Sequence, residues 1–193
     1  MARPRKDQEG PSASERIEQA FWELLEEKKF HSITVRDLTG RAKVNRNTFY
    51  YHFESVEDLA AKAIQGNIPR EFFSRLISML LEGSFDASVV QMAPDLETRF
   101  HRVRLTMRNG SYALSAMVKC EVVRLWLECM QIGKDELTPS DWARFDFVWG
   151  GITSLIASDH VHSSQEYLAE LEGGVAAAVS MLVVRIREGH SAS

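Results

Sequence analysis

Apolar side chains recur at helical spacing along most of the chain. The first clear example is Ile17, Phe21, Leu24 and Leu25, whose spacing of i, i+4, i+7 and i+8 places all four on one face of an amphipathic helix. No segment alternates apolar and polar residues in the way that a half-buried strand does, and no internal repeat is visible. The pattern therefore predicts an all-α fold of about nine helices.

Small polar residues mark where these helices begin, because a side-chain oxygen at a helix start can accept a hydrogen bond from the first turn. Proline and glycine mark the ends: Ile68-Pro69 is expected to break the fourth helix, and Gly83 to end the fifth. Residues 86–108 are ambiguous, with a new helix expected from Pro94. Long helices are expected over residues 111–132, 141–158 and 164–188. The predicted caps are Ser12, Thr34, Asn45, Ser55, Thr138 and Ser163.

Two short helices joined by a tight turn are predicted between Thr34 and Phe53. The first ends near Ala42, and Asn45 caps the second. Each helix also has a hydrophobic staple, in which an apolar residue before the cap packs against one in the first turn and fixes the angle of entry. The staple pairs are Ile33 with Leu38 and Val44 with Phe49. This arrangement is typical of a helix-turn-helix, whose second helix enters the major groove of DNA.

The net charge of -4 argues against binding to nucleic acid only if the charge is spread evenly along the chain. Within residues 36–52, Arg36, Arg41, Lys43 and Arg46 face only Asp37, so this stretch has a net charge of +3. The first residues add Arg3, Arg5 and Lys6, which we expect to form either an arm that enters the minor groove or a disordered solubilising tail. Positive charge is therefore concentrated where the helix-turn-helix is predicted.

The second of the two short helices offers groups for both kinds of DNA contact. Its first turn contains Arg46, which can pair with guanine, and Asn47, which can pair with adenine. The tyrosines and the histidine that follow are candidates for the sugar–phosphate backbone, as is the start of the preceding helix. The alternative is an ordinary amphipathic helix pair, in which the tyrosines pack and the cations are simply solvated. The candidate DNA-binding residues are Thr34, Arg36, Asn45, Arg46, Asn47, Thr48, Tyr50, Tyr51 and His52.

Residues from about Ile17 to Ile64 resemble the DNA-binding domain of the TetR (AcrR-like) family of bacterial transcriptional regulators. The shared pattern is the opening Ile33-Thr34-Val35, then Leu38, Ala42 and Val44, and the string TFYYHF at residues 48–53. The resemblance implies a homodimer in which each half places residues 45–52 in a major groove of an inverted-repeat operator. It also implies that Arg36, Arg46, Asn47 and Thr48 approach bases or nearby backbone, and that Tyr50, Tyr51 and His52 approach phosphates.

One departure from the family concerns the start of the fourth helix, where many members have a lysine that binds a phosphate. Here the residues are Glu54-Ser55-Val56-Glu57, with no cation. We expect that contact to be lost, or to be replaced by the N-terminal end of the helix, which favours anions. The expected consequence is a shallower salt dependence of DNA binding than in lysine-bearing relatives.

The predicted domains are a DNA-binding domain with its basic arm, residues 1–66, and an effector-binding and dimerisation domain, residues 67–193. Small residues give an independent indication of a dimer, because each mid-helix glycine costs about 1 kcal/mol relative to alanine and yet allows two helices to approach closely. We expect helices 141–158 and 164–188 to form a four-helix interface across a two-fold axis. The alternatives are close packing within one subunit and a helix break. The expected interface residues are Gly150, Gly151, Ser154, Leu155, Gly174, Ala177, Ala178 and Met181.

Large apolar and aromatic residues in the C-terminal part are candidates for an effector pocket, although any one of them can equally be ordinary core. Together they indicate a ligand that is largely hydrophobic or aromatic. Arg104, Arg108 and Arg124 can pair with a carboxylate if they face inward, but solvated surface arginines are the default. The candidate pocket residues are Phe73, Phe100, Met107, Tyr112, Met117, Trp126, Phe145 and Trp149.

The start of the chain has no apolar core typical of a signal peptide, and no apolar run approaches the roughly 18 residues needed to span a bilayer. We therefore expect a cytoplasmic protein with no membrane contact. Cys120 and Cys129 are nine residues apart, on opposite sides of one helix, so they cannot pair within it. They are expected to be reduced, buried core thiols rather than redox sensors.

The sequence favours a DNA-binding transcriptional regulator, a homodimeric repressor released from its operator by a small hydrophobic or aromatic effector. The alternatives are a transcriptional activator or co-activator of the same fold, and a ligand-binding module with weakened DNA binding. An α-helical enzyme is not supported by any nucleophile motif, paired-carboxylate site or metal-ligand cluster. No metal or cofactor is expected, since His160 and His162 are two residues apart and do not share a helix face.

Overall fold

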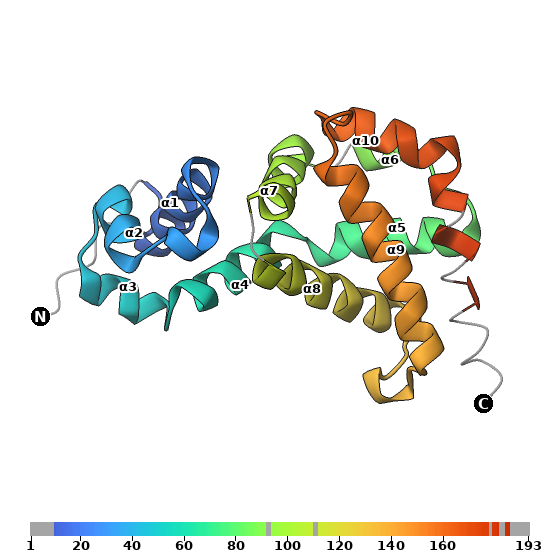
Figure 1. Ribbon diagram of the computed structural model, residues 1–193, viewed down its shortest axis with the longest axis horizontal. Helices are drawn as coiled ribbons and strands as arrows, with labels where there is room; N and C mark the ends of the chain where they lie inside the picture. The colour runs from blue at the N-terminus through green and yellow to red at the C-terminus, as the bar shows by residue number, and fades with distance from the viewer. Residues whose placement is uncertain (1–9, 92–93, 110–111, 178, 182–183, 186–193) are drawn as a thin grey trace, which may run out of the picture.

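The computed structural model describes residues 10–91, 94–109, 112–177, 179–181 and 184–185. In these residues it contains ten α-helices and no β-strand, which confirms the predicted all-α fold (Figure 1). The basic residues Arg3, Arg5 and Lys6 lie outside the described part. The helices are α1 (Ala13–Glu27), α2 (Val35–Ala42), α3 (Arg46–His52), α4 (Val56–Asn67), α5 (Arg70–Glu82), α6 (Ala87–Gln91), α7 (Leu96–Arg108), α8 (Tyr112–Met130), α9 (Pro139–Ala157) and α10 (Ser164–Glu170). The last of these continues into a π-helical stretch, η3 (Leu171–Val175).

All six predicted caps are present, each with a side-chain oxygen that accepts a hydrogen bond from the backbone N–H three residues later. The expectation that Pro94 opens a helix is wrong by two residues. The cap of α7 is Asp95, which has a left-handed backbone (φ 57°), and the helix proper begins at Leu96.

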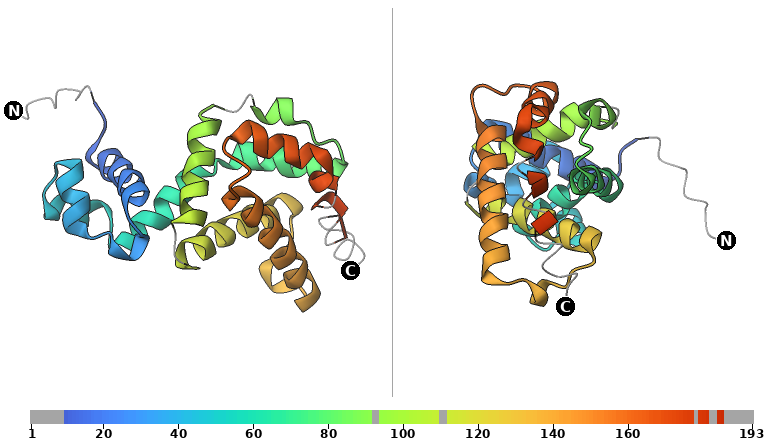
Figure 2. Two further views of the ribbon diagram at one scale, coloured as in Figure 1. Left: turned by 45° about the horizontal axis from the view of Figure 1, so that its top comes forward. Right: turned by 90° about the vertical axis from the view of Figure 1, so that its right-hand side faces the viewer.

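The N-terminal end of the molecule is a three-helix unit, α1 to α3, from which α4 runs towards the remaining helices (Figures 1 and 2). Its core is built from fully buried residues of α1 to α4, among them Phe21, Leu38 and Phe49. The same cluster continues into α8 through Leu114 and Val118, which are 0% and 2% exposed. The core of the helix-turn-helix unit is therefore completed by a helix from the C-terminal part.

The C-terminal part is formed by α5 to α10, with a second apolar cluster where α5, α8 and α9 meet. Helix α7 lies between the two ends of the molecule: it contacts α1 and α4 on one side, and α8, α9 and α10 on the other. No helix in the described residues has both the length and the hydropathy to cross a lipid bilayer.

The two cysteines are not both buried, so the prediction of two core thiols is wrong. Cys120 is exposed, because it lies on the outward stripe of α8 with Arg124 and Glu128. Cys129 is partly buried, and its thiol lies 3.3 Å from the hydroxyl oxygen of Ser74 on α5. They share one helix, as predicted, but only Cys129 packs against a neighbouring helix.

Candidate nucleic-acid interface and ligand chamber

The start of α3 is held by its own polar side chains. The Oδ1 atom of Asn45 accepts hydrogen bonds from the backbone N–H of Thr48 (2.8 Å) and from the Thr48 hydroxyl (3.1 Å). Asn45 is thus first of all the cap of the helix, and its amide nitrogen makes no hydrogen bond among the described residues. The side chain of Asn47 is exposed in the same turn. Of the residues predicted to approach bases, Asn47 and Arg36 are those whose side chains make no hydrogen bond among the described residues.

Arg46 is positioned by Tyr50, one turn further along α3. Its Nη2 atom donates to the Tyr50 hydroxyl at 3.2 Å, and its guanidinium carbon lies 5.5 Å from the centre of the tyrosine ring. A cation over an aromatic face is held electrostatically, so the two residues support each other on the exposed side of the helix. Tyr50 is 47% exposed.

The aromatic side chains at the end of α3 divide between the interior of the three-helix unit and its surface. Phe49 and Phe53 are buried in the core of the unit, whereas Tyr51 is 84% exposed. An aromatic ring this exposed at the end of a helix is typical of a binding surface, because the ring loses its unfavourable contact with water when a partner covers it. His52 is partly buried and contacts the edge of the Tyr51 ring.

The start of α2 is fixed by the carboxylate of Asp37, which accepts hydrogen bonds from several donors. The backbone N–H and the hydroxyl of Thr34 donate to Oδ2 of Asp37 at 2.9 and 2.7 Å, and the ammonium group of Lys28 approaches the same atom at 2.6 Å. The hydrogen bond from Lys28, with those from Thr34, lowers the pKa of Asp37 from 3.8 to about 2. The Thr34 hydroxyl is engaged within the protein, while Arg36 on the same turn is exposed.

The start of α4, where the sequence lacks a cation, carries an acid in the first turn instead. Asp58 accepts a hydrogen bond from the backbone N–H of Glu54 at 3.0 Å, and Lys62 approaches its carboxylate at 2.9 Å. Lys62 also donates to the backbone oxygen of His52, the last residue of α3. The hydrogen bond from Lys62 lowers the pKa of Asp58, which therefore stays ionised and is paired with Lys62 at the start of α4.

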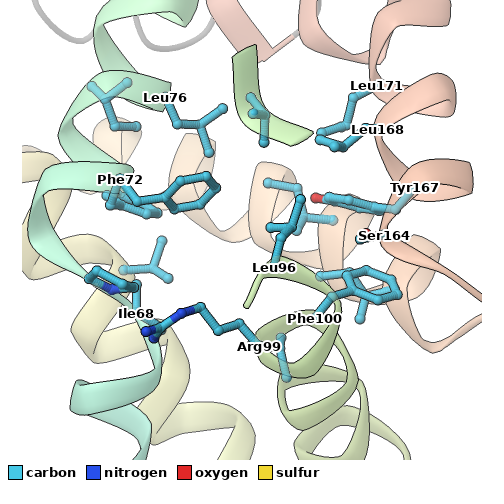
Figure 3. A pocket seen from close by; sticks show the side chains of 18 of the residues that line it. Ile68, Phe72, Leu76, Leu96, Arg99, Phe100, Ser164, Tyr167, Leu168 and Leu171 are labelled. Carbon is cyan, nitrogen blue, oxygen red and sulfur yellow. The ribbon is translucent and has the colours of Figure 1, made fainter. Parts of the chain in front are cut away.

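A second site is an apolar chamber of about 440 Å³ between the end of α4 and helices α5, α7, α8, α9 and α10. Four of the predicted pocket residues line it: Phe73, Phe100, Trp126 and Trp149. Prominent lining residues that the sequence did not single out are Phe72, Leu76, Leu96, Tyr167 and Leu168 (Figure 3). The volume lies within the range of small-molecule sites.

The other four predicted pocket residues do not line this chamber. Met107 and Met117 pack against the core of the helix-turn-helix unit, Phe145 belongs to the cluster formed by α5, α8 and α9, and Tyr112 is 92% exposed. Residue type alone does not show whether a large apolar side chain lines the chamber or packs elsewhere, because this depends on how α7, α8 and α9 are rotated about their axes relative to their neighbours.

The arginines proposed for a carboxylate also lie elsewhere. Arg104 donates to the backbone oxygen of Ser158, and the other two make ion pairs: Arg108 with Asp159, and Arg124 with Glu121 and Glu128.

The arginine that does line the chamber, Arg99, was missed. Its position shows in the sequence as a lone charge in the apolar stripe Leu96, Arg99, Phe100 and Val103 of α7, spaced i, i+3, i+4 and i+7.

Tyr167 brings a hydroxyl group into the chamber (Figure 3). This hydroxyl has no hydrogen-bond partner among the described residues. Burial raises the pKa of the phenol well above its usual value, so the group is neutral and can both donate and accept a hydrogen bond.

The predicted dimer surface is open on α9. Gly150, Gly151 and Ser154 are exposed, and a Cβ atom added to either glycine would meet nothing within 4 Å. Packing within the described part of the subunit therefore does not require these glycines. Phe147, which the sequence did not single out, lies on the same stripe and is 76% exposed.

The other predicted interface residues differ from one another in exposure. Ala177 is exposed and Met181 is 65% exposed, whereas Leu155 is partly buried and packs within the chain. Gly174 falls in the π-helical stretch, and Ala178 lies outside the described residues.

Comparison with known protein families gives a match over residues 18–63, which span most of α1, all of α2 and α3 and two turns of α4. The matching family is the bacterial regulatory proteins of the tetR family. Residues 18–63 are thus similar to the DNA-binding domain of this family. Through this domain the chain is a DNA-binding transcriptional regulator, as the sequence predicted. No curated protein matches the chain.

Proposed function

We propose that this regulator is a homodimeric repressor that binds an inverted-repeat operator through α3 and leaves it when a small hydrophobic or aromatic effector enters the chamber. The observation that carries the proposal is the position of α7. Leu96, Phe100 and Val103 on one face of this helix line the chamber. The opposite face of α7 makes polar contacts with α1 of the DNA-binding unit.

The contacts between α7 and α1 are polar and specific. The imidazole Nε2 of His101 lies 2.9 Å from a carboxylate oxygen of Glu26. Arg102 donates to the side-chain oxygen of Gln19 at 3.2 Å, and its guanidinium carbon lies 5.2 Å from the centre of the Trp22 ring. A ligand that displaces α7 therefore displaces α1, and with it the helix-turn-helix.

Release from the operator follows from a shift in the populations of two dimer conformers. In a dimer, the two α3 helices fit successive major grooves only at one separation. An effector that binds more tightly to a conformer with another separation reduces the fraction of dimer that can hold the operator. The effector then acts without touching DNA.

The outer stripe of α9 is the proposed centre of the dimer interface. It presents Phe147 beside the flat surface of Gly150 and Gly151, and Figure 2 shows α9 along one edge of the molecule. Val175 and Met181, exposed on the last helical segment, extend the apolar surface. Two copies related by a two-fold axis would bury both segments in a four-helix arrangement.

Operator fragments recovered by a genome-wide DNA pull-down would test the DNA-binding face. The Tyr51→Ala variant should weaken binding to all of them by a similar factor, whereas Arg46→Ala should also reduce the difference between matched and mismatched sites. Unchanged binding in both variants would contradict the assignment of α3. A reporter fused to a bound promoter then separates repression from activation, since a repressor lowers the signal and an activator of the same fold raises it.

A further inference from the structure

The chamber wall is apolar except for a few groups, and Arg99 is the one cation among its described lining residues. Glu71, the one acid among them, is exposed and makes no ion pair with Arg99. Arg99 is partly buried, so its guanidinium group loses part of its hydration, and hydrogen bonds or an opposite charge offset this loss. The partners of Arg99 therefore indicate what kind of ligand the chamber accepts.

Arg99 uses only part of its donor capacity within the protein. Its Nη1 atom donates to the backbone oxygens of Gly66 and Asn67, at 3.0 and 3.1 Å. Its Nε and Nη2 atoms have no partner among the described residues. Arginine has five N–H donors in a planar fork, and a carboxylate is the group that matches two of them at once.

The remaining wall suits the rest of such a ligand. Figure 3 shows the Arg99 side chain reaching along one edge of the chamber towards Ile68, on the same side as Phe72, with the rings of Phe100 and Tyr167 together on the far side. Aromatic and aliphatic side chains form nearly all of the remaining surface. A charged head can thus bind at one edge while an apolar body fills the volume beyond it.

We propose that the effector is a hydrophobic carboxylic acid, whose carboxylate binds Arg99 and whose aliphatic or aromatic body occupies the chamber. The inference rests on the proposed function of the chamber as the effector site. It also indicates how the head group is sensed. The carbonyls that Arg99 holds belong to the last two residues of α4, the helix that follows the helix-turn-helix. A carboxylate on the free Nε and Nη2 donors therefore binds the same guanidinium that holds the end of α4.

The test compares acids with neutral molecules of the same shape. The neutral dye N-phenyl-1-naphthylamine, which fluoresces in apolar sites, reports occupancy of the chamber in the full-length protein. Dodecanoic acid and 1-dodecanol form the aliphatic pair of competitors, and 2-naphthylacetic acid and 2-(2-naphthyl)ethanol the aromatic pair. A charge-assisted hydrogen bond predicts that the acid of at least one pair displaces the dye at a concentration about tenfold or more below that of its alcohol. The better pair distinguishes an aliphatic from an aromatic body.

Variants of the protein assign the preference to Arg99. Arg99→Gln retains an amide that can donate to the α4 carbonyls but removes the charge, so it should abolish the preference for acid over alcohol, measured as the ratio of the two displacing concentrations within the variant. Arg99→Lys, which keeps a charge without the fork, should retain part of the preference. The matched control is Arg75→Gln, at an exposed arginine of α5 outside the chamber wall, which should behave as the wild type.

The outcomes separate this inference from the proposed function. If alcohols displace the dye as well as acids do, and also release operator DNA, the chamber is an effector site but the carboxylate assignment is overturned. If the dye and all four compounds fail to bind, both proposals are overturned. An acid preference that survives in Arg99→Gln also overturns the assignment. Should that variant not fold, the acid-to-alcohol ratio of the wild type and of Arg99→Lys still decides.

Discussion

The carboxylate of Asp37 offers a quantitative test of how the helix-turn-helix is held together. Replacing it by asparagine keeps the shape and one acceptor oxygen but removes the charge that Lys28 and Thr34 approach. A lowering of the pKa from 3.8 to about 2 corresponds to at most about 2.4 kcal/mol of stability. The side chain is 34% exposed, so solvent screening reduces the expected loss at pH 7 to about 1 kcal/mol.

The sign of the pH dependence follows from the lowered pKa. Because the folded-state value lies below the unfolded one, the stabilisation is present above about pH 4 and is lost as the pH falls towards 2. Urea unfolding of the wild type and of Asp37→Asn should therefore show a difference at pH 7 that is reduced by about half at pH 3. The matched control Asp135→Asn, at an exposed acid outside this unit, should show no such change.

The role of Lys28 can be isolated in a double-mutant cycle. Lys28→Met removes the donor that lowers the pKa most, so in that background Asp37→Asn should cost less than it does in the wild type. A free-energy difference for Asp37→Asn that is the same at pH 7 and pH 3, or the same with and without Lys28, would refute the reasoning.

Three further predictions concern other parts of the molecule. Leu114→Ala should lower the free energy of unfolding by about 2–5 kcal/mol and speed amide exchange in α1, so effects confined to α8 would contradict the shared core. Phe147→Asp should convert the proposed dimer into a monomer in size-exclusion chromatography with light scattering, whereas an unchanged mass would contradict an interface on α9. Glu57→Lys should restore a cation at the start of α4 and steepen the log–log salt dependence of operator binding by about 0.9, and an unchanged slope would mean that no phosphate lies there.

Local interactions explain why the helix boundaries could be predicted. Each cap at Ser12, Thr34, Asn45, Ser55, Thr138 or Ser163 depends on a partner three residues away, so the relevant atoms are adjacent in the sequence. Asp95 was not predicted as a cap. Its backbone is left-handed and its side chain accepts no hydrogen bond from the first turn of α7, so it differs from the other six caps.

The chamber could be predicted only in part, because it depends on how helices face one another. Phe145 and Phe147 have the same side chain and lie two residues apart, about 200° around α9. The first is 3% exposed in the core and the second 76% exposed, and the sequence does not show which side of α9 faces inward. Arg99 was missed for a related reason, since its helix lay in the segment where the predicted boundaries were least clear.

The insertion of Leu114 and Val118 into the core of the helix-turn-helix unit has a practical consequence. A fragment that ends with α4 contains every residue predicted to contact DNA, yet it lacks two side chains that fill its own interior. Chimeric regulators made by exchanging residues 1–66 alone should therefore be unstable, or should need the first two turns of α8 from the same parent. The residues predicted to read DNA can be moved to another protein with α1 to α4, but the buried side chains of α8 that support these helices are not moved with them.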